Sequence, residues 1–238
     1  NPHVGGGGIE ALKAAGIQVT LGVREAQCRA QILPWTKHVT TGLPYVSLKL
    51  ALSLDGRIAT RSGASRWVTG PDARAKVHLL RSRSDAVAVG IGTTMADDPR
   101  LTVRDAPGEN PLRIVFDTNL RLAPESNLAQ TAKDVPTLVL CGPEASHDAE
   151  ARLAALGVEC MRLPLSAEGR LDVLVALRVL AQRGIVTLLV EGGAELAGSF
   201  LAGRLADELH AFIAPILLGP RGRPGAVDWA GPDTPQQA

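Results

Sequence analysis

Apolar runs alternate with amphipathic stretches along the chain from about residue 45 onward. The runs are rich in Val, Leu, Ile and Ala, and turn-forming residues separate them, a pattern typical of buried strands. We expect strands over 45–52, 86–89, 112–116, 137–141, 158–161, 186–190 and 207–218. The amphipathic stretches predict helices over 71–83, 147–156, 171–183 and 194–203.

Strands and helices therefore alternate through most of the chain. Pro71 stands in the first turn of one expected helix, and Gly157 and Gly184 follow the ends of two others, as Pro and Gly commonly do. Strands that are apolar along nearly their whole length are usually buried on both faces. The pattern predicts the α/β class, with a mostly parallel sheet and helices on both faces.

The first part of the chain shows a weaker pattern. Four glycines at 5–8 precede a helical pattern that Gly16 ends. Because no strand precedes these glycines, we interpret them as a flexible loop and not as a phosphate-binding turn. The remaining expectations are a strand over 17–21, a helical piece over 24–33, a linker over 40–44 and, further on, a turn of small residues over 90–94.

Composition narrows the class of protein. The net charge is +1 and aromatic residues make up 3% of the chain, so neither charge nor base stacking points to nucleic acid. No apolar run approaches the roughly 18 residues of a membrane span. The chain has three cysteines with no C-x-x-C pair, which favours reduced thiols and a cytoplasmic location. Its five histidines show no metal-ligand spacing, so we expect no metal.

Residues 46–104 are the most informative part of the chain. An apolar run containing Lys49 ends in Ser-Leu-Asp-Gly at 53–56, and Arg81 and Arg83 stand near the end of the next expected helix. The stretch closes on Ala-Asp-Asp-Pro-Arg-Leu-Thr at 96–102. Packing alone does not require so many Gly, Ser, Thr, Asp and Arg residues at element ends. We therefore expect a site for a phosphorylated ligand and a cofactor.

A second motif is Glu-Gly-Gly at 191–193, where a buried strand passes directly into a helix. Paired glycines let a ligand approach the backbone, and free N–H groups at a helix start favour anions. The motif fits a pyrophosphate seat, but it also fits a tight strand–helix turn that needs glycine only for its backbone angles. It is not the G-x-G-x-x-G fingerprint of a Rossmann domain.

Taken together, these strings resemble the reductase domain of the bifunctional riboflavin-biosynthesis deaminase/reductase family, over about residues 45–220. The resemblance implies a dihydrofolate-reductase-like fold and a homo-oligomer. It also implies NADPH-dependent reduction of the ribosyl group of 5-amino-6-(5-phosphoribosylamino)uracil to the ribityl form, so the substrate is a small phosphorylated aminopyrimidine.

The resemblance also assigns residues. The NADP(H) contacts it implies are Ala51, Trp67, Thr93, Asp97 and Thr118, with Gly193, Ala194, Glu195, Leu196, Ala197, Gly198 and Ser199 around the pyrophosphate. The substrate contacts it implies are Ser65, Arg81, Leu101, Arg104 and Glu191. Arginine suits a phosphate because its planar fork binds two oxygens at once. Lys49 and Glu191 are the catalytic candidates, with Lys49 binding the ribose or delivering a proton.

Two departures from the family accompany the resemblance. Residues 1–42 resemble the tail of a cytidine-deaminase-like domain plus a linker, but the H-x-E and P-C-x-x-C motifs of its zinc site do not occur in this chain. Zinc is thus expected only in a deaminase domain missing here, in a parent protein with both activities. The reductase domain, 43–238, is expected to be C-terminally truncated, because the family fold continues past Gly219 and Pro220 with further strands.

Some alternatives stay open. Asp117 stands where a Rossmann enzyme places its NAD-selecting acid, while Thr118 and Arg121 leave NADP acceptable. Asp55 is a turn former first and a catalytic carboxylate second. Rival functions are a dihydrofolate-reductase-like enzyme with another pterin-like substrate, a non-catalytic NADPH-binding remnant, and an α/β domain with no ligand.

Overall fold

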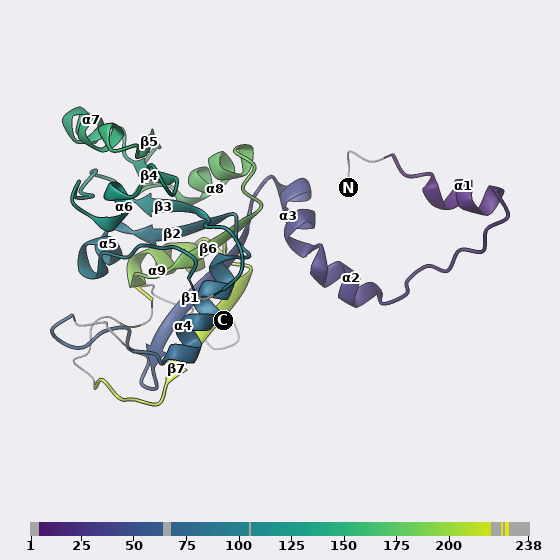
Figure 1. The fold of residues 1–238 in the computed structure, drawn as a ribbon, viewed down its shortest axis with the longest axis horizontal. Coiled ribbons are helices and arrows are strands. Elements are labelled where there is room, and N and C mark those ends of the chain that lie inside the picture. Colours follow the sequence, from purple (N-terminus) through teal and green to yellow (C-terminus); the bar gives the residue numbers. More distant parts are fainter. Residues whose placement is uncertain (1–4, 64–67, 105, 220–224, 226, 229–238) are drawn as a thin grey trace.

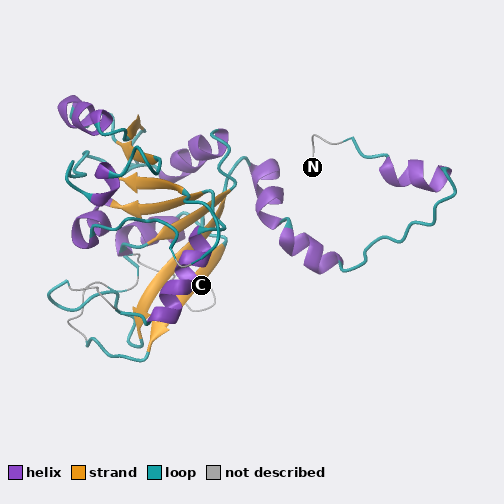
Figure 2. Ribbon diagram, in the orientation of Figure 1, coloured by secondary structure: helices purple, strands orange, loops and turns teal. Residues whose placement is uncertain are grey.

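The fold is built on one parallel sheet, seen in a computed structural model that describes residues 5–63, 68–104, 106–219, 225, 227 and 228. Its seven strands lie in the order β5-β4-β3-β2-β6-β1-β7, and every described strand pair is parallel (Figures 1 and 2). The strands are β1 (Tyr45–Ser53), β2 (Ala86–Gly90), β3 (Leu112–Phe116), β4 (Thr137–Cys141), β5 (Glu159–Arg162), β6 (Thr187–Glu191) and β7 (Glu208–Ala214).

The helices connect these strands and follow the chain in order. They are α1 (Gly8–Ala14), α2 (Glu25–Gln31), α3 (Leu33–Thr41), α4 (Pro71–Arg81), α5 (Ile91–Asp97), α6 (Asn127–Gln130), α7 (His147–Ala155), α8 (Val173–Gln182) and α9 (Ala194–Ala202). Ser126, Ser146 and Asp172 cap α6, α7 and α8, each accepting a backbone N–H of the first turn, which satisfies donors that a helix start leaves free.

Two hydrophobic layers enclose the sheet. On one face, Leu177 of α8 and Phe200 of α9 pack with Leu48 and other strand residues. On the other face, side chains of α5, α6 and α7 pack with Val115 and its neighbours, joined at the rim by Leu80 of α4. The expected α/β class with helices on both faces is therefore confirmed. The buried core consists mostly of Val, Leu, Ile and Ala, with Phe116 and Phe200 as its buried aromatic residues among those described.

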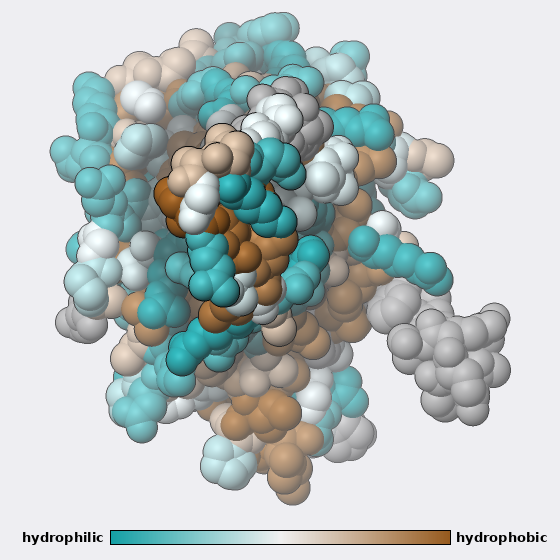
Figure 3. Space-filling view, turned by 90° about the vertical axis from the view of Figure 1, so that its right-hand side faces the viewer, coloured by the Kyte–Doolittle hydropathy of each residue, from teal (hydrophilic) through white to brown (hydrophobic). Residues whose placement is uncertain are grey.

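The N-terminal segment differs from the sheet. In Figure 1 α1 and α2 project away from it, and α1, α2 and α3 contain no buried residue. Figure 3 views the molecule from this side and shows hydrophobic surface at the front. Leu21 and Val23 are 63% and 67% exposed. The helices here follow local signals, without a core of their own.

Four expectations were wrong in detail. Residues 17–21 form no strand, because an alternating run still needs a partner strand and none of the described residues pairs with it. The expected linker over 40–44 begins inside α3, and the small-residue turn over 90–94 opens α5. The strand expected over 207–218 pairs with β1 only from Glu208 to Ala214. Among the described residues, no helix is long and apolar enough to cross a membrane.

Two described pieces of the C-terminal chain return to the sheet region. Gly225 forms an antiparallel bridge with Arg57, and the Asp228 N–H donates to the carbonyl of Ala194 at 2.9 Å. A Cβ atom on Gly198 would collide with the Asp228 carbonyl. Glycine at 198 is therefore explained by this close approach of the backbone.

Candidate active site

Lys49 and Glu191 meet across two neighbouring strands. They are register partners in the parallel pairing of β1 with β6. On β1, Leu48 and Leu50 are buried, while Lys49 and Ala51 are half-buried on the opposite face, as the two-residue period of a strand dictates. The structure thus brings the two catalytic candidates together on the face of the sheet that α4 approaches.

A buried ion pair joins Glu191 to the end of α4. Arg81 donates from Nη2 to Oε2 of Glu191 at 2.9 Å and from Nε to Oε1, a bidentate pair. The Nη1 group of Arg81 donates to the Thr102 carbonyl at 3.0 Å. The two side chains are only 11% and 8% exposed. Three N–H groups of the guanidinium are engaged, and its other two donate to none of the described residues, so a ligand could accept from them.

The charge state of Glu191 follows from this pair. Burial of the carboxylate would raise its pKa, but the charge and hydrogen bonds of Arg81, with Lys49 and His78, hold the pKa below its ordinary value. Glu191 is therefore ionised at neutral pH and accepts hydrogen bonds. It is suited to holding a hydroxyl or an amide of a ligand, and Lys49 is the better placed of the two to supply a proton.

The loop after α5 reaches the same place. Asp98 and Leu101 both have positive φ, 39° and 52°. The Asp98 carboxylate accepts from the backbone N–H and the side-chain amide of Asn127, at 2.8 and 2.7 Å, which ties the loop to the start of α6. Leu101 is buried in the core, so its side chain serves packing. Arg104 is exposed.

His78 connects this loop to α4. Its Nδ1 lies 3.2 Å from the Thr102 carbonyl and 3.2 Å from the backbone nitrogen of Arg104. Burial, followed by the charges of Arg81 and Arg104, lowers the pKa of the imidazole. Sequence reasoning missed His78. Its position three residues before Arg81, on the same helix face, was the available signal.

The Gly192–Gly193 turn lies against α5. Both glycines have positive φ, 92° and 76°, and a Cβ on Gly193 would lie 3.1 Å from Oγ1 of Thr93. The glycines are thus required by the backbone conformation as well as by the close contact. The turn leads from β6 directly into α9. The N–H groups in the first turn of a helix have no partner within the helix. These residues fit the pyrophosphate of a dinucleotide.

The seven residues assigned to that seat are not equivalent. Ala194, Leu196, Ala197 and Gly198 are buried, Glu195 is exposed, and Gly193 and Ser199 are half-buried. The Ser199 hydroxyl donates to the Glu195 carbonyl at 3.0 Å. The backbone N–H of Ala197 donates to Gly193 at 3.0 Å. A ligand at the helix start therefore has the backbone of 193–196 available, while Gly198 serves the contact with Asp228.

Thr118 and Asp117 follow β3, next to β2. Asp117 is fully buried, and its Oδ2 accepts the N–H of Leu122 at 2.8 Å; burial raises the pKa of this carboxyl. Its side chain faces the protein interior and shapes the loop. Arg121, whose side chain is 55% exposed, is 3.9 Å from Asp117. Thr118 is half-buried.

These positions share one edge of the sheet. Strands β3, β2, β6 and β1 are consecutive neighbours, and Thr118, Thr93 and Gly193 follow the ends of the first three. Ligands of open parallel sheets bind at the carboxyl ends of the strands. Asp97, half-buried, ends α5 at this edge. Ser65 and Trp67 lie outside the described residues.

Asp55 has a structural role. Its carboxylate accepts from the Ser53 hydroxyl at 2.6 Å and from the N–H groups of Leu218 and Gly219 at 3.0 and 2.7 Å. The Ser53 hydrogen bond, followed by the backbone donors, lowers the pKa of Asp55 to about 2. The carboxylate thus holds the chain after β7 to the turn after β1, which favours the turn-forming interpretation.

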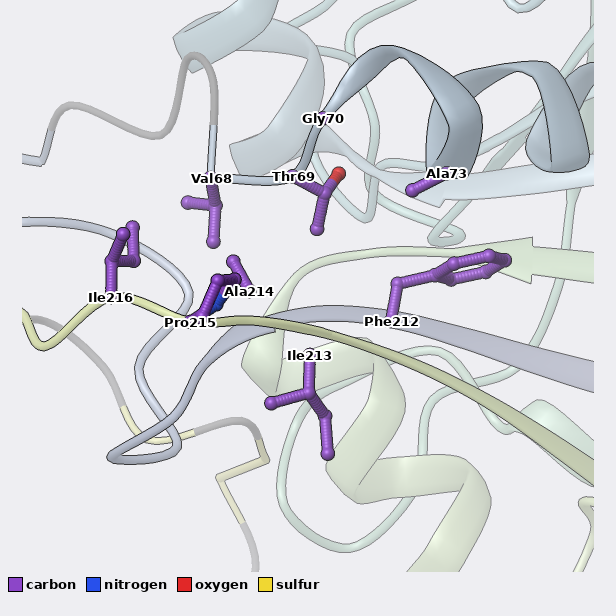
Figure 4. A pocket seen from close by; sticks show the side chains of 9 residues that line it. All are labelled: Val68, Thr69, Gly70, Ala73, Phe212, Ile213, Ala214, Pro215 and Ile216. Atoms are coloured by element: carbon purple, nitrogen blue, oxygen red, sulfur yellow. The ribbon is translucent and has the colours of Figure 1, made fainter.

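A shallow apolar hollow lies between the start of α4 and the end of β7 (Figure 4). Figure 4 shows Val68 and Thr69 on one side and Pro215 and Ile216 on the other, with the start of α4 above. The assigned ligand residues that the structure describes are not among those lining it. Within the described part of the chain, no group of three or more His, Cys, Asp or Glu side chains is arranged to hold a metal ion.

Comparison with known proteins agrees with this geometry. The chain is 38% identical to the riboflavin biosynthesis protein RibD of Bacillus amyloliquefaciens, over 97% of this chain and 62% of that protein. It is 37% identical to the Escherichia coli RibD protein, over 92% of this chain and 61% of that protein. The chain therefore spans about three fifths of the length of these curated relatives.

Solved structures give the same result. RibD of Acinetobacter baumannii superposes with a TM-score of 0.82 at 34% identity, covering 100% of this chain and 64% of that one. The riboflavin biosynthesis reductase Rib7 of yeast superposes with a TM-score of 0.65 over 85% of this chain and 89% of that one, at 23% identity, a likeness of fold alone. The expected dihydrofolate-reductase-like fold is confirmed. A family model described as the RibD C-terminal domain matches residues 44–236, and the chain belongs to this family.

Proposed function

We propose that this chain reduces the ribosyl group of 5-amino-6-(5-phosphoribosylamino)uracil to the ribityl form with NADPH, as the reductase part of a bifunctional riboflavin-biosynthesis protein. The observation that carries the proposal is the Lys49–Glu191–Arg81 cluster beside the Gly192–Gly193 turn. The printed name of a Thermotoga maritima structure, 33% identical over 90% of this chain, includes this reductase activity.

In this proposal the charged groups divide the substrate between them. The exposed Arg104 and the free N–H groups of Arg81 bind the phosphate, because guanidinium groups match its oxygens bidentately. The ionised Glu191 accepts hydrogen bonds from hydroxyl or amide groups of the substrate. Its pairing with Arg81 fixes its orientation before the substrate arrives, so little reorganisation is needed on binding.

NADPH, when bound, would supply a hydride to the ribosyl carbon. Reduction at that carbon opens the ribose ring C–O bond, so the ring oxygen takes up a proton. We assign that proton to the ammonium group of Lys49, which stands next to Glu191 in the strand register. Both the carbon and the oxygen therefore gain hydrogen, and the lysine is reprotonated from water.

The cofactor assignment draws on the edge formed by β3, β2 and β6. The backbone at 192–196 would hold the pyrophosphate, with Thr93 after β2, Thr118 after β3 and Ala51 on β1. The Asp117 side chain is buried and accepts the N–H of Leu122, so it presents no carboxylate at the surface where the cofactor would bind. This supports NADPH over NADH, because an inward carboxylate does not repel a 2′-phosphate.

The wider parts of the proposal concern the parent protein. We assign residues 1–42 to the tail of a deaminase-like domain and its linker, and zinc to that domain. The absence of buried residues in α1, α2 and α3 supports a segment without a core of its own. We also assign a cytoplasmic location and a homo-oligomer. Leu209 and Ile213 on edge strand β7, 55% and 60% exposed, offer a surface for a second copy, which light scattering can test.

The central test is NADPH oxidation, followed by absorbance, with the freshly deaminated aminouracil ribosyl phosphate. Turnover supports the proposal. NADPH binding without turnover, measured by fluorescence, would favour the non-catalytic remnant. Oxidation with a dihydropterin in place of the phosphorylated substrate would favour the other enzyme class.

Two variants test the division of the site. Arg104→Ala should weaken substrate binding about tenfold or more, since a charge-assisted contact is lost, and leave NADPH affinity nearly unchanged. Gly193→Val should abolish NADPH binding, because a branched side chain meets Thr93 and a positive φ. Equal loss of both ligands in Arg104→Ala, or retained NADPH affinity in Gly193→Val, would contradict the assignment.

A further inference from the structure

His78 occupies a position between the two arginines assigned to the substrate. It lies on α4 one turn before Arg81, it is 8% exposed, and its Nδ1 approaches the loop that carries Arg104. The resemblance assigns it no role. Among the described residues, its hydrogen-bonding groups are the Thr102 carbonyl and the Arg104 backbone nitrogen, both on that loop.

The hydrogen-bond geometry around Nδ1 selects one tautomer. Nδ1 lies 3.2 Å from both the Thr102 carbonyl, an acceptor, and the Arg104 backbone N–H, a donor. The Thr102 carbonyl already accepts from Nη1 of Arg81 at 3.0 Å. If Nδ1 carried the proton, the N–H of Arg104 would face another N–H. If Nδ1 is unprotonated, it accepts the Arg104 N–H while the Thr102 carbonyl keeps its Arg81 donor, and the 3.2 Å contact between Nδ1 and that carbonyl oxygen is one between two acceptors.

We propose that His78, as a neutral imidazole protonated on Nε2, is a positioning residue that fixes the backbone of Arg104 and thereby the phosphate-binding arginine itself. This inference rests on the proposed function for the identity of the substrate. The loop is also held at Asp98, through Asn127, and at Thr102, through Arg81. Arg113 holds it at Arg100, and Asn110 accepts from the N–H of Val103 at 2.8 Å. His78 supplies the hold at Arg104.

The charges around His78 favour its neutral form. Arg81 on its own helix and Arg104 on the loop both disfavour a positive imidazole, and burial acts in the same direction. Glu191 on β6 and the Thr102 carbonyl act in the opposite direction and are the smaller influences. Protonation would convert Nδ1 from an acceptor into a donor, release the Arg104 N–H and place a third cation beside the two arginines.

The direct test is nitrogen NMR of the full 238-residue chain at neutral pH. The two imidazole nitrogens of His78 should report Nε2 protonated and Nδ1 unprotonated. Nδ1 protonation would overturn the proposal. This measurement needs neither substrate nor turnover, so it stays decisive even if the proposed reaction fails.

A pair of variants then tests positioning. His78→Asn places an amide oxygen near the position of Nδ1, whereas His78→Gln places its amide nearer that of Nε2. We expect His78→Asn to keep the substrate KM within about threefold of the original, and His78→Gln to raise it about tenfold through an unpaired N–H. In both, kcat and NADPH affinity should change less than about twofold. Equal KM values in the two variants would overturn positioning by Nδ1.

The pH profile gives a readout that a packing role would not move. The substrate KM of the original chain should rise on acidification as His78 takes up a proton, and His78→Asn should lack this component. The substrate phosphate titrates as well, but it does so equally in both proteins, so their ratio isolates His78. A ratio that stays constant with pH would contradict the proposal. A chain without turnover would refute the proposed function and leave the NMR result standing.

Discussion

Arg81 and Arg113 are both buried arginines, yet their surroundings differ in kind. Arg113, on β3, is fully buried, and its Nη groups donate to the carbonyls of Arg100, Leu128, Thr131 and Val135 and to the hydroxyls of Thr131 and Thr137. Arg81 is held by a carboxylate and one carbonyl. The Arg113 guanidinium donates to neutral acceptors, although its buried Nε has no partner among the described residues, whereas Arg81 donates mainly to a carboxylate.

The comparison teaches how to separate structural from functional charge. Burial lowers the pKa of Arg113 to about 10, still far above neutral pH, so it joins the loop at Arg100 to α6 and β4 as a permanent cation. Arg81 sits at a strand edge with glycines, a lysine and an open loop nearby. Burial and an unused N–H are common to both, so what marks Arg81 as a ligand-site residue is its pairing with Glu191 at the carboxyl end of β6.

The largest expected effect is on stability, from Arg113→Met. Several buried carbonyls lose their donor together, and each unpaired polar group costs about 1–3 kcal/mol. We expect the free energy of unfolding to fall by about 4 kcal/mol, measured by urea denaturation. Because no carboxylate accepts from the Arg113 side chain, this loss should be the same at pH 5 and pH 8. A strong pH dependence would contradict this expectation and implicate an acid such as Asp134, whose charge acts on Arg113.

Arg81→Met should cost about 3 kcal/mol, because it leaves the buried Glu191 carboxylate unpaired. Here the loss should depend on pH. Without Arg81, burial raises the pKa of Glu191, so the variant loses stability as pH rises through that value and recovers part of it in acid. The double variant Arg81→Met, Glu191→Leu serves as the control and should lack this dependence. A loss independent of pH would mean that Glu191 is not charged in the fold.

Asp117→Asn should have a smaller effect and sharpens the comparison with a buried anion. Burial raises the pKa of Asp117, so its unfavourable contribution grows as pH rises through that pKa. The variant should therefore gain stability relative to the original at higher pH in denaturation experiments. Its NADPH-to-NADH affinity ratio should stay within about twofold, since an inward acid takes no part in selecting the cofactor. A shift of that ratio toward NADPH would show that Asp117 does take part in selecting the cofactor.

The smallest expected effect concerns the stability of the original chain in mild acid. The pKa of His78 is lowered in the fold, so its neutral form contributes stability above the unfolded value of about 6.5. That contribution is lost as pH falls from there toward the folded pKa. Denaturation from pH 7 to pH 5.5 should show a decline that His78→Asn reduces. Parallel curves for the two proteins would argue against a neutral buried imidazole.

The sequence predicted the sheet better than the details of its edge. Apolar runs identify β2, β3, β4 and β6 because strands buried on both faces leave a continuous signal. The 17–21 run carried an alternating strand signal and formed no strand, because pairing depends on partners that a local pattern does not contain. Helix α5 was missed for a different reason. Its glycine and threonines are weak helix formers, so the local sequence does not indicate a helix there.

The site was predicted through residues with distinctive motifs, and the rest required three-dimensional contacts. Lys49 and Glu191 were singled out separately, and only the β1–β6 register shows that they are neighbours. The roles of Thr102 and Asn127 rest on a carbonyl and a capping contact, which side-chain chemistry does not reveal. The inward direction of Asp117 likewise depends on the N–H of Leu122, five residues later.

The strand order has a consequence for how this chain is made. β1 is bordered by β6 and β7, so during synthesis an apolar strand waits unpaired until more than 130 residues have followed it, from Ser53 to Thr187. Pairings between segments so far apart in sequence slow folding, and until they form the unpaired strand exposes hydrophobic surface that favours aggregation. Since the same late pairing joins Lys49 to Glu191, ligand binding at that pair should report the completion of folding.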